Sequence, residues 1–184
     1  MPTLDAPPPV LSPNSVLANA LLRSIDMIRP QVIAKRPKRI VFVVGTQING
    51  APHLGTNIVQ TSAFLLAKLA RRSFGVETAV TYFHSLCIDP VDGGYLDLAT
   101  LYRNVIKERA FVREPDVLYV MVKGGDWAFG AQLVDGALLA LGTPAADMPA
   151  RIFTPMVLSG SGAKLSKSLL RAAPDSPAHA GIEE

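Results

Sequence analysis

The stretch Ile40-Val41-Phe42-Val43-Val44-Gly45 decides the fold. An unbroken apolar run rich in β-branched residues is typical of a strand that is buried on both faces of a parallel sheet. The turn-rich segment 45–52 follows this strand and leads into a long helical pattern at about 54–73. That pattern ends near Gly75, a residue type that often terminates helices. The central part of the chain therefore begins with a strand, a turn and a helix.

The same alternation extends along the rest of the chain. An earlier helix is expected at about 15–29, capped by Asn14 or Ser15 and ended by Pro30. Strands that alternate with helices predict an α/β fold, a Rossmann-like parallel sheet with helices on both faces. We expect one domain over 14–170, preceded by a disordered proline-rich arm (1–13) and followed by a flexible tail (171–184). The further strands are expected at 77–86, 117–122 and 152–158, and the further helices at 95–110 and 127–141.

The composition favours a folded domain in the cytoplasm. Of the 184 residues, 49% are apolar and 18% are charged, and the net charge of +3 is too small for a dedicated nucleic-acid binder. Lys68, Asp126 and Asp135 interrupt the long apolar stretches, so none reaches the roughly 18–20 residues that a membrane span needs. The N-terminus lacks the basic and apolar regions of a signal peptide. The single cysteine, Cys87, excludes an intramolecular disulfide and a cysteine-based zinc site.

The unusual residues of the chain gather where the expected strands end. They lie in the segments 45–56, 84–94, 123–126 and 159–168. Parallel strands bring their carboxyl ends to one edge of a sheet, and ligands bind there near the point where the strand order reverses. We therefore expect one composite site formed by these four segments.

The first candidate motif is His53-Leu54-Gly55-Thr56, at the start of a predicted helix. A helix start presents unpaired N–H groups and the positive end of the helix dipole, both of which attract phosphate. Gly55 leaves room for a nucleotide close to the backbone, and His53 can donate a hydrogen bond to an anionic oxygen. A surface histidine at an ordinary helix start explains this motif equally well.

The second candidate motif is Lys164-Leu165-Ser166-Lys167-Ser168, after the glycine-rich segment 159–162. Two ammonium groups in such a loop can close over a triphosphate and stabilise the charge that grows on departing pyrophosphate. A P-loop is excluded because Ala163 precedes Lys164, where that motif requires glycine. A basic, serine-rich surface loop is the alternative.

Three segments together resemble the signatures of class I aminoacyl-tRNA synthetases. Ile48-Asn49-Gly50-Ala51-Pro52-His53-Leu54-Gly55 resembles the first (HIGH) signature, most closely that of the methionine-type branch. Residues 155–168 resemble the second (KMSKS) signature with its strand and loop lead-in. Lys123-Gly124-Gly125-Asp126 is similar to the glycine–aspartate segment that these enzymes carry near the ribose and adenine. The resemblance covers roughly residues 38–170.

The resemblance implies an ATP-dependent ligase reaction. A carboxylate, that of an amino acid or related acid, attacks the α-phosphate of ATP to give an acyl-adenylate and pyrophosphate, normally with Mg²⁺. The acceptor would be tRNA, a small molecule or a carrier, and a homodimer or a partner subunit is compatible with the chain. The short stretch after Ser168 leads us to expect no anticodon-binding domain. The implied catalytic residues are His53, Lys164 and Lys167, and the implied ATP-binding residues are Asn49, Gly50, His53, Gly55, Thr56, Gly124, Gly125, Asp126, Lys164, Ser166, Lys167 and Ser168.

The acceptor pocket and the activity leave alternatives open. Asp89 is a candidate to hold a substrate amino group and His84 a candidate donor or base, although a capped strand end explains both equally well. We expect no metal site formed by the protein alone, and we expect Trp127 and Phe129 in the core. One alternative function is a nucleotidyltransferase of the same broad fold. Another is a catalytically inactive relative that binds nucleotide or tRNA and regulates or scaffolds a partner.

Overall fold

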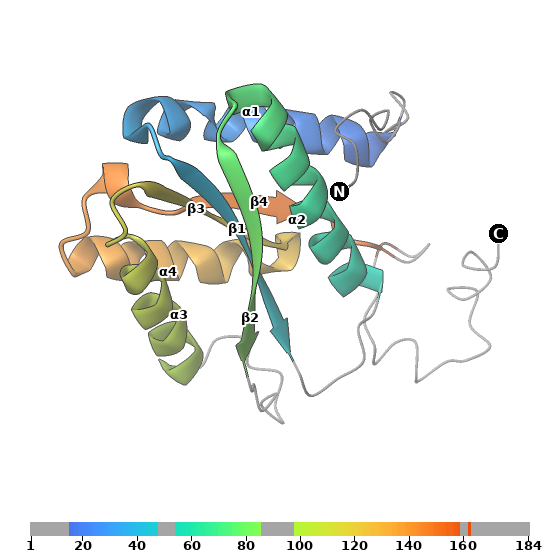
Figure 1. Ribbon diagram of the computed structural model, residues 1–184. Helices are drawn as coiled ribbons and strands as arrows, with labels where there is room; N and C mark the ends of the chain where they lie inside the picture. The colour runs from blue at the N-terminus through green and yellow to red at the C-terminus, as the bar shows by residue number, and fades with distance from the viewer. Residues whose placement is uncertain (1–14, 48–53, 86–97, 159–161, 163–184) are drawn as a thin grey trace.

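The computed structural model describes residues 15–47, 54–85, 98–158 and 162 (Figure 1). The expected arm (1–13) and tail (171–184) lie outside these residues. The described elements alternate between helix and strand, as the sequence predicts. In chain order they are α1 (Val16–Lys35), β1 (Arg39–Gln47), α2 (Leu54–Phe74), β2 (Glu77–Ser85), α3 (Leu98–Phe111), β3 (Val117–Gly124), the 3₁₀ turn η1 (Gly125–Trp127), α4 (Ala128–Ala140), the 3₁₀ turn η2 (Ala145–Asp147) and β4 (Ala150–Thr154).

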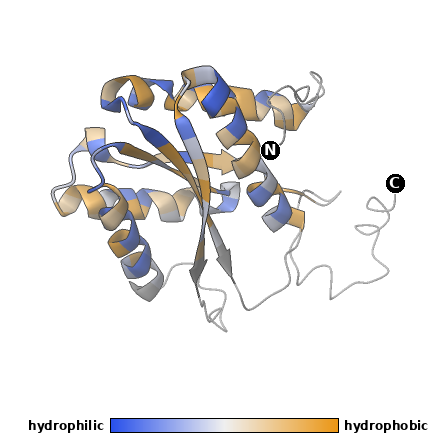
Figure 2. Cartoon of the chain, in the orientation of Figure 1, coloured by the Kyte–Doolittle hydropathy of each residue, from blue (hydrophilic) through white to orange (hydrophobic). Residues whose placement is uncertain are grey.

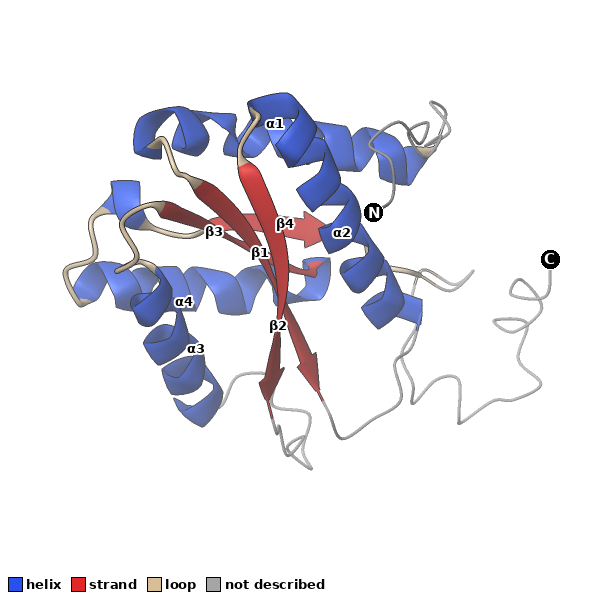
Figure 3. Cartoon of the chain, in the orientation of Figure 1, coloured by secondary structure: helices blue, strands red, loops and turns tan. Residues whose placement is uncertain are grey.

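The four strands form one sheet in the order β2-β1-β3-β4, and all neighbouring pairs are parallel (Figure 3). This confirms the predicted α/β fold, a Rossmann-like sheet flanked by helices. The chain places β2 on one side of β1 and then returns to place β3 on the other side. The strand order therefore reverses between β1 and β3, whose carboxyl ends lie at the same edge of the sheet.

Helices cover both faces of the sheet. Ile40, Phe42 and Val44 of β1 pack in a core with residues of α1 and α2, while Val41 and Val43 face the side of α3 and α4. All five are at most 8% exposed, which confirms that β1 is buried on both faces. In Figure 2, hydrophobic residues concentrate on the central strands, and the helices alternate between hydrophobic and hydrophilic positions.

Helix α1 is longer than predicted. Ser15 caps it, since its side chain accepts a hydrogen bond from the Ala18 N–H at 3.4 Å, but the helix continues past Pro30 to Lys35. Proline removes one backbone hydrogen bond and crowds the preceding turn, yet Ile28 and Val32 on either side of it are both buried. The apolar contacts of these residues keep the chain helical through a position where the local rule predicts an end.

We expect Pro30→Ala to raise the free energy of unfolding by roughly 2 kcal/mol. A proline inside a helix costs about 3 kcal/mol, and up to about 1 kcal/mol of this is offset because proline restricts the unfolded chain. Pro30 is exposed, so alanine leaves no cavity. Urea denaturation measures the change, with Pro115→Ala in the exposed turn before β3 as a control that should not stabilise. No gain from Pro30→Ala would show that α1 accommodates the ring without strain.

Strand β4 is shifted toward the N-terminus relative to the prediction of 152–158. It spans Ala150–Thr154, and Leu158 makes only an isolated bridge. Pro155 follows the last strand residue and has no N–H for the ladder, which accounts for the end of the strand. In contrast, α2 ends as predicted, with Gly75 at a φ of 67° and its N–H bonded to the Arg71 carbonyl at 3.0 Å.

Candidate functional site

The structure describes part of the predicted site. Gly55, Thr56, Gly124, Gly125 and Asp126 are described with their surroundings, and the backbone of His84 lies in β2 opposite Thr46 of β1. The other predicted residues lie outside the described part of the chain. These are Asn49, Gly50, His53, Asp89, Lys164, Ser166, Lys167 and Ser168.

Two of the predicted ATP-binding segments adjoin the strands between which the order reverses. Gly55 and Thr56 lie in the first turn of α2, the helix that follows β1, and both are partly exposed. Gly124 ends β3, and Gly125 and Asp126 form η1 directly after it. In sheets of this kind, ligands bind outside the carboxyl ends of the strands at the reversal.

The turn after β3 is tightly built around its two glycines. A Cβ atom on Gly124 would lie 2.5 Å from Oδ1 of Asp126, so the Asp126 carboxylate folds back over the glycine. A Cβ atom on Gly125 would lie 3.3 Å from the carbonyl oxygen of Thr154, the last residue of β4. Gly124 therefore leaves room for the exposed Asp126 carboxylate, and Gly125 leaves room for the close approach of β4.

A buried ion-pair cluster lies on the α3 and α4 side of the sheet. Arg151 of β4 donates hydrogen bonds to Oε2 of Glu108 in α3 at 2.7 Å and to both carboxylate oxygens of Asp135 in α4. Glu108 is fully buried, and the Arg151 side chain is 10% exposed. Burial alone would lower the pKa of Arg151, but the bonds to Asp135 and the charge of Glu108 raise it. The cluster ties β4 to both helices.

Two lysines extend this cluster toward the site edge. The Lys107 ammonium in α3 donates to Oδ1 of Asn104 at 3.0 Å, and the Lys123 ammonium at the end of β3 lies 3.5 Å from the same oxygen. Lys123 also lies over the ring of Trp127, 4.6 Å from its centroid. Burial and then the charge of Lys107 lower the pKa of Lys123 to about 8. Burial likewise lowers the pKa of Lys107.

This cluster is not among the features that the sequence predicts. A signal was present in α3, where Glu108 continues the helical stripe of the apolar residues Leu101 and Val105. A charged residue on such a stripe is buried with a partner, and its partner cannot be located from the sequence alone. The prediction that Phe129 is in the core is wrong, because Phe129 is 69% exposed. It lies on the outer side of α4, whose buried residues are Gly130, Ala131, Val134 and Leu138.

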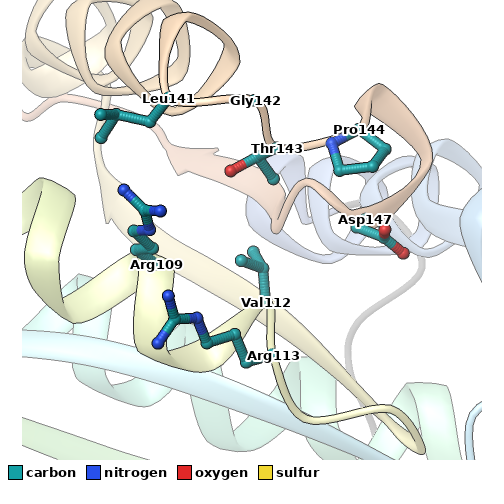
Figure 4. Close-up of a pocket in the computed structure, with 8 residues that line it drawn as sticks. All are labelled: Arg109, Val112, Arg113, Leu141, Gly142, Thr143, Pro144 and Asp147. Atoms are coloured by element: carbon teal, nitrogen blue, oxygen red, sulfur yellow. The ribbon is translucent and has the colours of Figure 1, made fainter.

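A hollow of about 240 Å³ lies away from the candidate site (Figure 4). It opens between the end of α3 and the connection from α4 to β4, beside the amino ends of β3 and β4. Its charged residues are Arg109, Arg113 and Asp147. Since ligands of parallel sheets bind at the carboxyl ends of the strands, this hollow is a separate feature.

Among the described residues, no three histidine, cysteine, aspartate or glutamate side chains lie close enough to hold a metal ion. None of the described helices combines the length and the apolar character that crossing a membrane requires. Comparisons with family models, curated proteins and solved structures give no match to the chain.

Proposed function

We propose that this domain binds ATP at the carboxyl edge of the sheet and activates the carboxylate of an amino acid or related acid as an acyl-adenylate. The observation that supports this most is the position of the strand-order reversal. It falls between β1 and β3; Leu54 and Gly55, which end the segment resembling the first motif, lie in the first turn of the helix that follows β1, and the segment resembling the middle motif ends β3 and forms η1. Sheets of this kind bind ligands outside the carboxyl ends of their strands at such a reversal, which supports the proposal.

Each segment has a distinct role in the proposed site. The first turn of α2 offers N–H groups to phosphate, and Gly55 allows the nucleotide to approach the backbone. Asp126, held over Gly124, accepts hydrogen bonds from the ribose hydroxyls. His53, Lys164 and Lys167 would bind the phosphates. Mg²⁺ would be bound mainly through the triphosphate, as is usual for this ion, with Asp126 in the turn after β3 as a carboxylate that could contribute.

The reaction places little covalent work on the protein. A carboxylate oxygen of the substrate bonds to the α-phosphorus, and the bond from that phosphorus to the pyrophosphate oxygen breaks. Catalysis then depends on aligning the two reactants and stabilising the negative charge that moves onto pyrophosphate. The basic residues of the second motif would supply this stabilisation.

Pyrophosphate exchange into ATP tests the proposal, with the twenty common amino acids added singly. Exchange that depends on one amino acid would support adenylate formation. If no amino acid supports exchange but calorimetry shows that ATP binds, the alternative of a nucleotide-binding relative without catalytic activity would be favoured over the proposed reaction. A gel shift at moderate salt then addresses tRNA, because binding driven by phosphate contacts weakens steeply as salt rises.

We expect Gly124→Ala to weaken ATP binding about tenfold or more. The backbone of Gly124 (φ −65°, ψ 150°) suits alanine, so the only conflict is between the new methyl group and the Asp126 carboxylate. Displacing this carboxylate loses a charge-assisted hydrogen bond, typically worth about 1.5–3 kcal/mol. Calorimetry measures the affinity, and Gly136→Ala in α4, where an added Cβ meets nothing within 4 Å, is the matched control. Equal affinities would remove Asp126 from the proposed site.

A further inference from the structure

The sheet has an open position at its carboxyl edge, on the side of α3 and α4. Gly45 of β1 pairs with Phe83 of β2. The ladder between β1 and β3 ends at the pair Val44–Val122, and Lys123 directly follows Val122 in β3. Gly45 and Phe83 therefore form a pair in which one residue has no side chain, just beyond the last pair between β1 and β3.

The space above Gly45 is not filled by the described residues. A Cβ atom built on Gly45 meets nothing within 4 Å, and the residue is exposed. Phe83, which is 39% exposed, and the stem of Lys123 flank this space. A small group can thus lie against the backbone of β1 between an aromatic ring and an ammonium-bearing side chain.

Helix α3 adds a second ammonium group to this position. Lys107 lies over the ring of Phe83, 4.7 Å from its centroid, and shares the Asn104 amide oxygen with Lys123. Among the described residues, no carboxylate forms an ion pair with either lysine. The two partly buried ammonium groups therefore share the neutral oxygen of Asn104, and each also lies over an aromatic ring, Phe83 for Lys107 and Trp127 for Lys123.

The adjoining charges leave the cluster short of negative charge. Arg151 engages both Glu108 and Asp135, so the cluster holds three cations and two carboxylates. Oε1 of Glu108 and Nη1 of Arg151 are buried and have no hydrogen-bond partner among the described residues. Buried polar atoms are normally satisfied, and the unpartnered Nη1 of Arg151 is a cationic donor that adds to the positive character of the cluster, whereas Oε1 of Glu108 is an acceptor and would need a donor.

We propose that Lys107 and Lys123 bind an oxyanion, a carboxylate or phosphate of a small ligand that lies over Gly45 beside the ring of Phe83. One oxyanion can accept hydrogen bonds from both ammonium groups and supply the negative charge that the cluster lacks. Such bonds are strong because both partners are ionised and partly shielded from water. This binding does not require adenylate formation and so stands apart from the proposed reaction.

The site should bind its ligand in a pH-dependent way. Lys123 has a pKa of about 8. The charged groups around it are Lys107 and Glu108 of α3 and Arg151 of β4. Asp135 of α4 is bonded to that arginine, and Asp126 follows in the turn after β3. Gly45 and Phe83 bring no titratable group from β1 and β2. The oxyanion binds the protonated lysine, so affinity should be full below pH 8 and fall by up to about tenfold per pH unit above it.

Calorimetry on the full chain tests this, with sodium succinate and inorganic phosphate as separate probes at pH 7 and pH 9. We expect at least one probe to bind at pH 7 and to bind about tenfold more weakly at pH 9. Lys107→Met and Lys123→Met should each lose about tenfold or more in affinity at pH 7. Lys38→Met is the matched control, since Lys38 is 80% exposed and pairs with Asp116 near the amino ends of the strands.

Lys123→Arg provides the sharper comparison, because arginine stays charged at pH 9. It should retain binding and lose most of the pH dependence, a result that a merely structural lysine would not give. The proposal would be overturned if neither probe binds, or if both methionine variants bind as tightly as the unaltered protein. It would also be overturned if the unaltered protein binds equally well at pH 7 and pH 9.

Two further arms identify the source of the oxyanion. Competition by ATP but not by adenosine would assign it to a nucleotide phosphate, whereas simultaneous binding of succinate and ATP would assign it to a carboxylate ligand. Either result supports the site. Loss of pyrophosphate exchange with oxyanion binding intact would contradict only the proposed reaction.

Discussion

Arg151→Met should lower the free energy of unfolding by about 3–5 kcal/mol. Glu108 is fully buried, and Arg151 is the partner that compensates its charge. Methionine fills much of the arginine volume but leaves this carboxylate uncompensated in the protein interior. Removing one partner of a buried ion pair is costly because the remaining charge keeps its desolvation penalty.

Urea denaturation provides the measurement, with Arg39→Met as the matched control. Arg39 pairs with Glu77 at 3.1 Å, but both side chains are at least half exposed, so its loss should cost less than about 1 kcal/mol. The double variant Glu108→Leu/Arg151→Met removes both buried charges and should recover most of the lost stability. A cost for Arg151→Met similar to that of Arg39→Met would show that solvent reaches Glu108.

Lys164→Ala should reduce the rate of pyrophosphate exchange by about 10²–10³-fold. In the proposed reaction, the Lys164 ammonium contacts charge that develops mainly in the transition state. Its loss should therefore lower the rate far more than it weakens ATP binding. Exchange kinetics and calorimetry on the same variant separate the two effects.

Lys68→Ala is the control for this experiment, because Lys68 is an exposed lysine of α2. It removes the same charge from the surface and should leave the exchange rate unchanged. A Lys164→Ala variant with full exchange activity would remove the second motif from the mechanism. A variant that loses ATP binding and exchange equally would assign Lys164 to ground-state binding instead.

Local patterns in the sequence predicted most of the fold. The run from Ile40 to Val44 identified β1, and Gly75 located the end of α2, because each depends on residues close together in the chain. The prediction that α1 ends at Pro30 is wrong because the outcome there depends on residues far apart in the chain. Burial of Ile28 and Val32 against the core outweighed the local preference to end α1, and the sequence does not specify that packing.

The candidate site could be predicted only in its local parts. The turn at Gly124 and Asp126 was identified because its residues are adjacent. The cluster of Glu108 and Arg151 was not, because these residues are 43 positions apart and meet only through the placement of β4 beside β3. Strand order is a property of the whole sheet, so no local pattern predicts the contact.

The strand order also has a consequence for synthesis on the ribosome. Once β1 and β2 have paired, β3 adds to the free side of β1 and β4 adds to β3, so no strand must insert between two others. Helices α1 and α2 are complete before β2 emerges, and they can shield one face of the growing sheet early. The opposite face waits for α3 and α4. Nascent chains are therefore most exposed to aggregation and chaperone capture in the interval between β2 and α4.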